Sequence, residues 1–264
     1  MTPVIVTALE KAPLRGAFLL CLFFITLLSF PAGADDCKPC LGVLHEVSRV
    51  IDGDTLALKS GATVRLIGIN TPELGRQGEE DQPGAGAARD YLQGLVERSS
   101  RLIHVCPGAE RQDRYGRRLA HVSDREGRSM VRQLLRQGMG HVIAVPPNLG
   151  NSACYQDAES LARKAGLGVW REPLRNAASL RGDETGFHHL EGRIVRVGES
   201  RSAVWLNLEG GLALRITWKE WAAFQIEDPE QLVGEHLEAR GWIYRRKGAQ
   251  RLRIRHPSAL RWLE

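Results

Sequence analysis

Short apolar runs separated by turn residues follow residue 42 and predict a β-rich domain. Each run is rich in β-branched or aliphatic residues and is bounded by residues that favour turns. We expect strands at residues 43–51, 54–59, 62–69, 101–106 and 117–123. Five such strands are typical of a small barrel of the OB type.

Apolar residues at helical spacing appear three times in the same region. They predict helices at about residues 85–98, 129–137 and 153–165, with buried positions at Tyr91, Leu92, Leu95, Val96, Met130, Val131, Leu134, Leu135, Ala158, Leu161 and Ala162. Ser129 and Gly138 suit the caps of the second helix. Residues 74–84 have no apolar period and are expected to form a mobile loop. The pattern therefore predicts an α+β domain at residues 43–172, made of a five-stranded barrel and three helices. Trp170 is expected to mark the end of this domain.

Strand-like alternation resumes further along and predicts a second domain at residues 189–264. Its segments read GRIVRV, AVWLNLE, LALRITW, HLEARGWIY and QRLRIR, with a short helix expected from Trp218 to Phe224. A segment of this size can bury one small core, so we expect a second OB-like β-barrel. Residues 173–188 have little apolar periodicity and are predicted to be a linker.

The first 34 residues have the pattern of a signal peptide. Lys11 and Arg15 precede the apolar run GAFLLCLFFITLLSF, and the small residues Ala32 and Ala34 follow it. The run is shorter than the ~20 residues that span a bilayer, so contact with a membrane is expected only if this segment is retained as an anchor. Cleavage after Ala34 would place the protein in the periplasm or outside the cell.

Four cysteines remain after residue 34, and their even number favours disulfides. Cys37, Cys40, Cys106 and Cys154 allow three pairings, and an oxidising compartment would make them structural. A redox pair at Cys37 and Cys40, or a zinc site, is the alternative, but the chain has neither a second C-x-x-C nor a thioredoxin-like setting. We expect the leader at 35–42 to be linked to Cys106 and Cys154.

Oxygen-bearing side chains gather around one predicted hairpin. The segments VIDGDTLAL and VRLIGINTPE flank the turn Ser60-Gly61. Pairing outward from that turn sets Leu56 opposite Arg65 and Asp54 near Ile67. Asp54 and the corner at residues 70–73 would then lie at the same end of the hairpin.

This corner has the composition of a hard-cation site next to a phosphate site. Carboxylate, amide and carbonyl oxygens bind Ca²⁺, and the Arg65 guanidinium can bind a phosphate through two hydrogen bonds. The segment DRYGRRLAHV adds Arg114, Tyr115 and Arg117 at the start of another strand. Each feature alone is an ordinary turn or helix start. Together they indicate metal-assisted hydrolysis of phosphodiesters.

The motifs VIDGDT, RLIGINTPE and DRYGR, in this order, resemble the staphylococcal nuclease (thermonuclease) family over residues 43–172. The resemblance implies an OB-fold nuclease domain in which Asp54, Asn70 and the Thr71 carbonyl bind Ca²⁺ and Asp52 supports these ligands. It also implies that Glu73 orients or deprotonates the attacking water and that Arg65 and Arg117 stabilise charge on the phosphate. Arg114 and Tyr115 would contact the substrate.

Members of this family cleave DNA and RNA with little sequence preference at the bond to the 5′ oxygen, leaving 3′-phosphate ends. The resemblance therefore implies nucleic-acid substrates and no small-molecule cofactor. Two departures from the family pattern are visible. Asn70 stands where the staphylococcal enzyme has an aspartate, so a looser metal site is expected. Ala144 and Pro146 replace tyrosines, and since stacking is worth ~1–3 kcal/mol per base, mononucleotide binding should be weaker.

The C-terminal segment is strongly basic. Between Arg240 and Leu263 it has no acidic residue and carries Arg240, Arg245, Arg246, Lys247, Arg251, Arg253, Arg255 and Arg261, interleaved with Trp242, Tyr244 and Trp262. It could bind nucleic-acid strands, or its aromatics could be core and its arginines merely solvated. The net charge of +5 fits a polyanionic partner but would also aid solubility.

Three functions are consistent with the sequence. The first is an exported, Ca²⁺-dependent endonuclease without sugar preference. The second is a nucleic-acid-binding protein on a nuclease scaffold whose catalysis lapsed through Asn70, although Arg65, Glu73 and Arg117 argue against it. The third is an envelope interaction protein acting through the C-terminal domain. The choice between DNA and RNA and the oligomeric state stay open.

Overall fold

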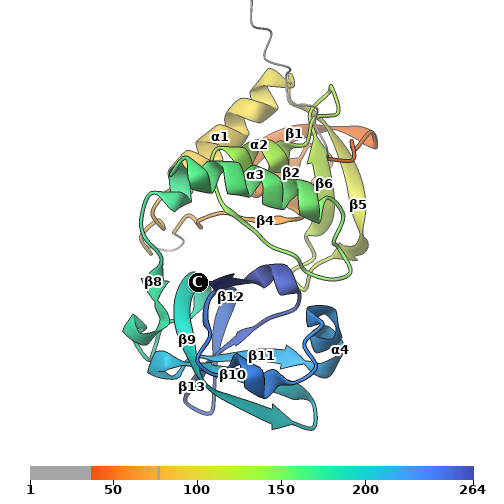
Figure 1. Ribbon diagram of the computed structural model, residues 1–264. Coiled ribbons are helices and arrows are strands. Elements are labelled where there is room, and N and C mark those ends of the chain that lie inside the picture. Colours follow the sequence, from red (N-terminus) through yellow and green to blue (C-terminus); the bar gives the residue numbers. More distant parts are fainter. Residues whose placement is uncertain (1–36, 76–77) are drawn as a thin grey trace, which may run out of the picture. The chain divides into compact units, whose positions relative to one another are not determined.

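The computed structural model describes residues 37–75 and 78–264 (Figure 1). The expected signal peptide falls outside these residues, so its structure is not described. Within the described ranges no helix combines the length and apolar character needed to cross a bilayer. Residues Asp35–Glu264 form one unit by their contacts, and this unit contains two barrels.

The first barrel closes five strands in the order β1-β2-β3-β6-β5. These strands are β1 (Val43–Asp52), β2 (Thr55–Leu58), β3 (Thr63–Leu66), β5 (Leu102–Gln112) and β6 (Arg118–Ser123). All neighbours run antiparallel except β3 and β6, which are parallel. The predicted barrel is confirmed, although β5 continues to Gln112, past the predicted end at residue 106.

The expected register of the β2–β3 hairpin was wrong by one residue. Arg65 pairs with Thr55, and Leu56 pairs with Val64. The turn has three residues, because the Leu58 amide donates to the Ala62 carbonyl at 2.9 Å and Gly61 adopts a positive φ of 84°. Arg65 therefore lies opposite the residue that follows Asp54.

Three helices cover this barrel and lie next to one another (Figure 1). They are α1 (Ala85–Arg98), α2 (Met130–Arg136) and α3 (Ser152–Lys164), as the periodicity predicts to within a few residues. The Ser129 hydroxyl caps α2 by accepting from the Arg132 amide. The expected burial of Leu161 was wrong, since this side chain is 49% exposed. The face of α3 that packs inward carries Tyr155, Ala158 and Ala162.

Two disulfides join the leader to the first barrel. Cys37 pairs with Cys154, and Cys40 pairs with Cys106. The expectation that the leader is linked to these two cysteines is confirmed, and all four sulfurs are used. Loops of 117 and 66 residues are closed in this way, which restricts the unfolded chain and stabilises the folded one.

The second barrel closes through the pairing of β9 with β12. Its strands are β9 (Gly186–Ser200), β10 (Ala203–Leu208), β11 (Ala213–Thr217), β12 (His236–Arg246) and β13 (Ala249–Arg253), while β14 (Leu260–Leu263) extends the sheet beside β12. Only β11 and β13 pair in parallel within this ring. A short helix, α4 (Trp218–Trp221), begins with a capping box between Thr217 and Glu220. The predicted second barrel is confirmed.

Part of the expected linker belongs to this second sheet. The strand β8 (Arg175–Asn176) pairs with β9, the 3₁₀ turn η2 (Ala177–Ser179) follows, and β9 begins at Gly186. Ala177 is buried in the core. Apolar periodicity did not predict this structure, because few apolar side chains of the segment enter the core.

The core of the second barrel is mainly aliphatic. It includes Ile194, Val204, Leu206, Leu214, Ile216, Leu237, Ile243 and Leu252, with Trp221 as its buried tryptophan. Trp242 and Trp262 are 44% and 40% exposed, so the interpretation of these two as core residues was wrong. The exposed aromatics of this barrel therefore require an explanation other than packing of its core.

Candidate functional site

The corner at residues 70–73 is built where the chain leaves β3 and forms β4 (Ile69–Asn70). β4 pairs with β7 (His141–Val142), which fixes Asn70 opposite His141. Gly68 makes the turn between β3 and β4 with a φ of 94°, and a Cβ there would lie 2.4 Å from the Tyr155 ring. Only glycine fits this approach, so the turn that positions Asn70 and Thr71 depends on it.

Asp54 is the buried centre of this corner. Its Oδ1 accepts from the Thr55 hydroxyl at 3.0 Å, and its Oδ2 accepts from the Thr71 amide at 3.1 Å. The Arg65 Nη2 lies 2.7 Å from the same Oδ2. Burial raises the pKa of Asp54 to about 7, against the opposing effect of the Arg65 guanidinium, and the charges of Asp52 and Glu73 raise it further. A bound cation would favour the ionised form.

The Arg65 guanidinium connects the residues of the corner. Its Nη1 donates to the Leu66 and Ile69 carbonyls at 2.8 and 2.9 Å, which fixes the side chain against the main chain. Its Nη2 donates to the Asn70 Oδ1 at 3.2 Å as well as pairing with Asp54. The side chain is only 8% exposed. The fixed Arg65 guanidinium therefore contacts Asp54 and Asn70, the two side chains that were predicted to bind the metal ion.

The predicted metal ligands converge at this point. The Asn70 Nδ2 donates to the Thr71 carbonyl at 3.3 Å, and the Asp52 Oδ1 accepts from the Asp54 amide at 3.1 Å. Among the described residues no group of three His, Cys, Asp or Glu side chains could hold a metal. A hard cation here would need the neutral oxygens of Asn70 and Thr71 beside Asp54, with water completing its shell. Oxygen donors of this kind fit Ca²⁺.

Glu73 is exposed beside the corner, at the start of the loop that leads to α1. Its amide donates to the Gln82 Oε1 at 3.0 Å, and its carbonyl accepts from the Gln82 amide at 3.0 Å. These bonds anchor the start of the expected mobile loop to its end, while residues 76–77 are not described. The charge of Glu73 contributes to the raised pKa of Asp54.

The third motif forms a separate basic group in the β5–β6 turn. Arg117 donates through Nε to the Asp113 Oδ2 at 2.7 Å. Burial opposes ionisation of Asp113, but the hydrogen bonds from Arg117 and Tyr115 lower its pKa. Tyr115 is 69% exposed, and the guanidinium carbons of Arg114 and Arg117 lie 4.8 and 5.6 Å from its ring centroid. No hydrogen bond among the described residues links this group directly to Asp54.

Strand pairing nevertheless brings the two groups to neighbouring strands. Arg65 pairs with Leu119 in the parallel β3–β6 ladder, and Arg117 precedes Leu119 by two residues. The structure thus brings Asp52, Asp54, Arg65, Asn70 and Thr71 into direct contact, and it places Arg114, Tyr115 and Arg117 at the start of the adjacent strand. Ala144 and Pro146 follow β7 in a segment, residues 143–149, that has no aromatic side chain.

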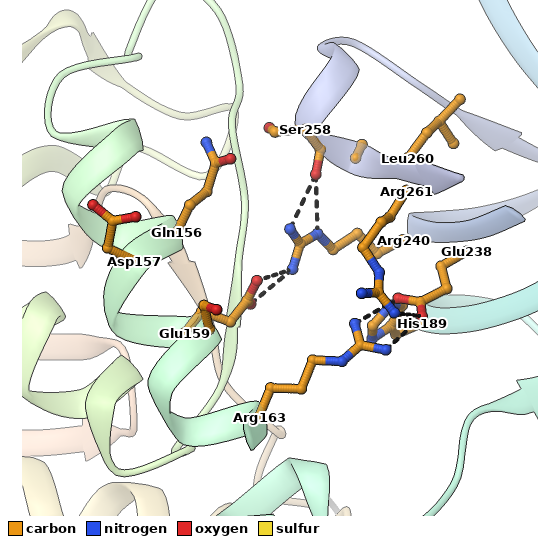
Figure 2. A pocket seen from close by; sticks show the side chains of 12 residues that line it. Gln156, Asp157, Glu159, Arg163, His189, Glu238, Arg240, Ser258, Leu260 and Arg261 are labelled. Atoms are coloured by element: carbon orange, nitrogen blue, oxygen red, sulfur yellow. Dashed lines mark hydrogen bonds and ion pairs between the residues drawn. The ribbon is translucent and has the colours of Figure 1, made fainter. Parts of the chain in front are cut away.

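A second polar cluster lies between α3 and the second barrel, around a cavity of about 320 Å³ (Figure 2). Arg163 pairs with Glu238, and Arg240 pairs with Glu159 at 2.6 Å. His189 also bonds Glu238, at 3.1 Å. Burial would raise the pKa of Glu238, but its hydrogen bonds from Arg163, His189 and Arg261 lower it. Because its central charges pair with one another, we interpret this cluster as a structural contact that joins the two barrels. The sequence did not reveal it, since its partners are far apart along the chain.

Comparison with known proteins places the first barrel in a family. The family described as Staphylococcal nuclease homologue matches residues 63–172. A thermonuclease from Staphylococcus intermedius is 34% identical over 132 residues, which cover 49% of this chain and 77% of the relative. Endonuclease YhcR from Bacillus subtilis is 32% identical over 137 residues, 48% of this chain and 11% of the relative.

A fungal relative gives a similar match. The probable endonuclease LCL3 from Paracoccidioides lutzii is 33% identical over 119 residues, covering 41% of this chain and 33% of the relative. The chain thus spans only a small part of the last two proteins but most of the staphylococcal one. Since that thermonuclease is 34% identical and the match covers 77% of its length, the chain belongs to the staphylococcal nuclease family.

Proposed function

We propose that the chain is a Ca²⁺-dependent endonuclease that hydrolyses phosphodiester bonds of DNA and RNA and leaves 3′-phosphate ends. The observation that carries the proposal is the buried corner in which Arg65 contacts both Asp54 and Asn70. An oxygen-rich site and a guanidinium at the same place match the two needs of phosphodiester hydrolysis, a cation and a phosphate anchor. Membership of a nuclease family supports it.

Arg65 and Arg117 would hold the phosphate from two sides. The two main-chain carbonyls bound by Arg65 keep its guanidinium in place. Its Nη2 could therefore exchange its contact with Asp54 or Asn70 for a hydrogen bond to a phosphate oxygen without moving the side chain. Arg117 has a side chain that is 28% exposed and can approach the substrate from solvent. Both charges would offset the negative charge that develops on the phosphate oxygens.

Glu73 would act on the attacking water. It is exposed, its charge acts on Asp54, and Gln82 holds its main chain, which suits a carboxylate that must meet both solvent and substrate. Glu73 would take a proton from water as the water oxygen bonds to phosphorus. The bond to the 5′ oxygen then breaks, that oxygen takes a proton from solvent, and the phosphate stays on the 3′ side.

Asp54, Asn70 and the Thr71 carbonyl are the residues that would hold the cation. When bound, Ca²⁺ would neutralise charge on the phosphate and make the water more acidic. Asp54 is the one carboxylate proposed as a direct ligand, while Asp52 orients it through the Asp54 amide. With one carboxylate and two neutral oxygens, the affinity for Ca²⁺ should be modest.

We further propose that the protein acts in the periplasm or outside the cell. Two disulfides are formed by all four cysteines after residue 34, and such bonds persist in oxidising compartments. The apolar run within residues 1–34 has the length and flanking charges of a signal peptide.

A second candidate is a nucleic-acid-binding protein without catalysis. The observation in its favour is that Asn70 is neutral and that Arg65 already satisfies oxygens of both Asp54 and Asn70. In this case Arg65, Arg117 and Tyr115 would bind phosphate without hydrolysis.

The test is to incubate the purified chain with plasmid DNA and with RNA, in Ca²⁺, in Mg²⁺ and in a chelator. Degradation that requires a divalent ion and yields 3′-phosphate ends would support the endonuclease. Binding by folded protein without degradation in either ion would support the second candidate instead.

A further inference from the structure

The outer face of the second barrel carries an ordered set of polar and aromatic side chains. Strand register places Trp205 of β10 opposite Arg215 of β11 and opposite Gly198 of β9. Their neighbours in sequence are buried, so these residues point outward. The next row across the sheet runs through Arg196, Asn207, Ala213, Arg251 and Tyr244.

Trp205 is the centre of this face. The guanidinium carbons of Arg251 and Arg215 lie 4.8 and 5.7 Å from its ring. Its indole nitrogen donates to the Ser200 hydroxyl at 3.2 Å, which fixes the ring on the sheet. An indole and stacked guanidinium groups together form a flat cationic platform, because both can stack on nucleobases.

The same face is hollowed into a groove of about 320 Å³. Trp205, Asn207, Arg196 and Arg251 line it, and the small residues Gly198 and Ala213 leave room above the sheet. Glu199 is the acidic residue among its lining residues. Charge at the groove is therefore mainly positive, which favours a polyanion.

Further arginines follow Arg251 along β13 and just after it. Arg251, Arg253 and Arg255 are at least partly exposed and alternate with the buried Leu252 and Ile254, so they share one side of the strand. Arg253 pairs with Glu220 at 2.8 Å. Burial lowers the pKa of Arg255, and the nearby charges of Arg253 and Arg114 lower it further, while Glu220 and Glu110 oppose them.

Arg114 belongs to the β5–β6 turn, where it donates to the Tyr115 hydroxyl at 2.7 Å. The charge of Arg114 acts on Arg255, together with the charges of Arg253, Glu220 and Glu110. The residues of the outer face were not all visible as a group in the sequence. Trp205 and Arg215 lie outside the basic segment at 240–263 and join it only through the pairing of β11 with β13.

We propose that this face, centred on Trp205, Arg215 and Arg251, binds single-stranded nucleic acid. Unpaired bases can stack on the platform, whereas a duplex keeps its bases stacked inside, so a single strand is the expected partner. This binding does not rest on the proposed nuclease function.

The test uses the intact chain and two fluorescent substrates in parallel. One is a trinucleotide, whose cleavage would report on the corner of the first barrel. The other is a single strand longer than the roughly 4–16 nucleotides that one OB barrel covers. Binding of the long strand is measured in a Glu73→Gln background, so that it does not depend on catalysis, and cleavage is measured with Glu73 present.

Trp205→Ala should weaken binding of the long strand roughly 5- to 150-fold, the loss expected for one stacked base. Arg215→Gln with Arg251→Gln should lower the slope of log affinity against log salt by about 1.4. Cleavage of the trinucleotide should not change in either variant. Arg245→Gln is the matched control, because it removes the same charge from the opposite side of β12.

Unchanged binding of the long strand in Trp205→Ala would overturn the proposal. The proposal would also fail if Arg245→Gln lost as much affinity for the long strand as the variant that combines Arg215→Gln with Arg251→Gln. It would fail as well if these face variants lost affinity for phosphatidylglycerol vesicles but kept their affinity for the strand. If the parent cleaves neither substrate, the proposed nuclease function fails, yet the binding measurements still decide whether this face binds strands.

Discussion

The two barrels have the same topology but carry different chemistry. In each, the first three strands form a meander, the first pairs with the fourth, and the third pairs in parallel with the fifth. In the first barrel Thr55 pairs with Arg65, while the matching pair in the second barrel is Ala203 and Thr217. The matching position therefore lacks the guanidinium that binds Asp54.

The turn between the first two strands also differs, because it is acidic only in the first barrel. Asp52 and Asp54 flank Gly53 in the first barrel, and Ser200 and Ser202 flank Arg201 in the second. The corner that β4 occupies in the first barrel is replaced by α4, whose Trp218 donates to the Ser200 carbonyl at 3.0 Å. The same fold thus carries a polar site at its strand ends in the first barrel, whereas α4 covers the corresponding position in the second barrel.

On the outer faces of the barrels, it is the second barrel that carries the larger aromatic and charged side chains. Ala57 and Thr63 pair on the first barrel at the place where Trp205 and Arg215 pair on the second. Small neutral residues there offer no stacking platform. The comparison supports our proposal that catalysis and strand binding are divided between the two barrels of one chain, and the following changes test that division.

The largest effect is expected for Glu73→Gln, which keeps the shape of the side chain and removes its basicity. Turnover should fall by roughly 10²- to 10⁴-fold, the usual contribution of a general base. Steady-state cleavage of DNA in Ca²⁺ measures it. Glu80→Gln is the control, because it removes a charge from the same loop, and turnover of Glu73→Gln equal to that of the control would exclude the assigned role.

Arg117→Ala should lower turnover by about 10²- to 10³-fold through loss of charge stabilisation at the phosphate. Circular dichroism should show an intact fold, since Asp113 keeps its hydrogen bond from the Tyr115 amide. The neighbouring Arg118 is exposed and provides the matched control. If Arg118→Ala is equally impaired, the effect is one of general charge and not of Arg117.

Glu238→Gln should break the joint between the barrels. Glu238 is buried and bonds Arg163, Arg261 and His189, so its loss leaves cations without their partner and should cost about 3–5 kcal/mol of unfolding free energy. Chemical denaturation measures this, with the exposed Glu235→Gln as control. A loss no larger than that of the control would mean that the network does not hold the barrels.

The pH dependence of stability follows from the same residue. The folded-state pKa of Glu238 is lowered, so its contribution is present above the unfolded pKa of about 4.3 and is lost as pH falls below it. The difference in stability between wild type and Glu238→Gln should therefore shrink in acid. A difference that stays constant from neutral pH to acid would contradict the ionised pair.

The smallest effect is expected for Asn70→Asp, which adds a charged ligand to the corner. Affinity for Ca²⁺ should rise roughly tenfold, or ~1.4 kcal/mol. Asn207→Asp makes the same change on the second barrel and should leave Ca²⁺ affinity unaltered. Equal affinities of the two variants in calorimetry would show that position 70 is not a ligand.

Local patterns in the sequence were sufficient for the strands of the first barrel, its helices and the partners of the leader cysteines. The register of the hairpin was missed, because a three-residue turn with Gly61 in the left-handed region competes with the two-residue turn that the sequence suggests. Leu161 was misplaced because helical periodicity does not show which edge of an apolar stripe meets the barrel.

The site was partly predictable for the same reason. Asp54, Arg65 and Asn70 lie within a short segment, so a hairpin brings them together. The Glu238 network and the Trp205 face unite residues from distant segments, and only the closed barrel and the packing of α3 bring them into contact. Such groups leave no local pattern in the chain.

The most direct test of the division between the barrels is a calorimetric titration of the intact chain with Ca²⁺, repeated on Asp54→Asn. The account predicts a single Ca²⁺ site in the wild type that is lost in the folded variant, because Asp54 is its one charged ligand. Undiminished binding by Asp54→Asn would contradict it and place the cation elsewhere in the chain.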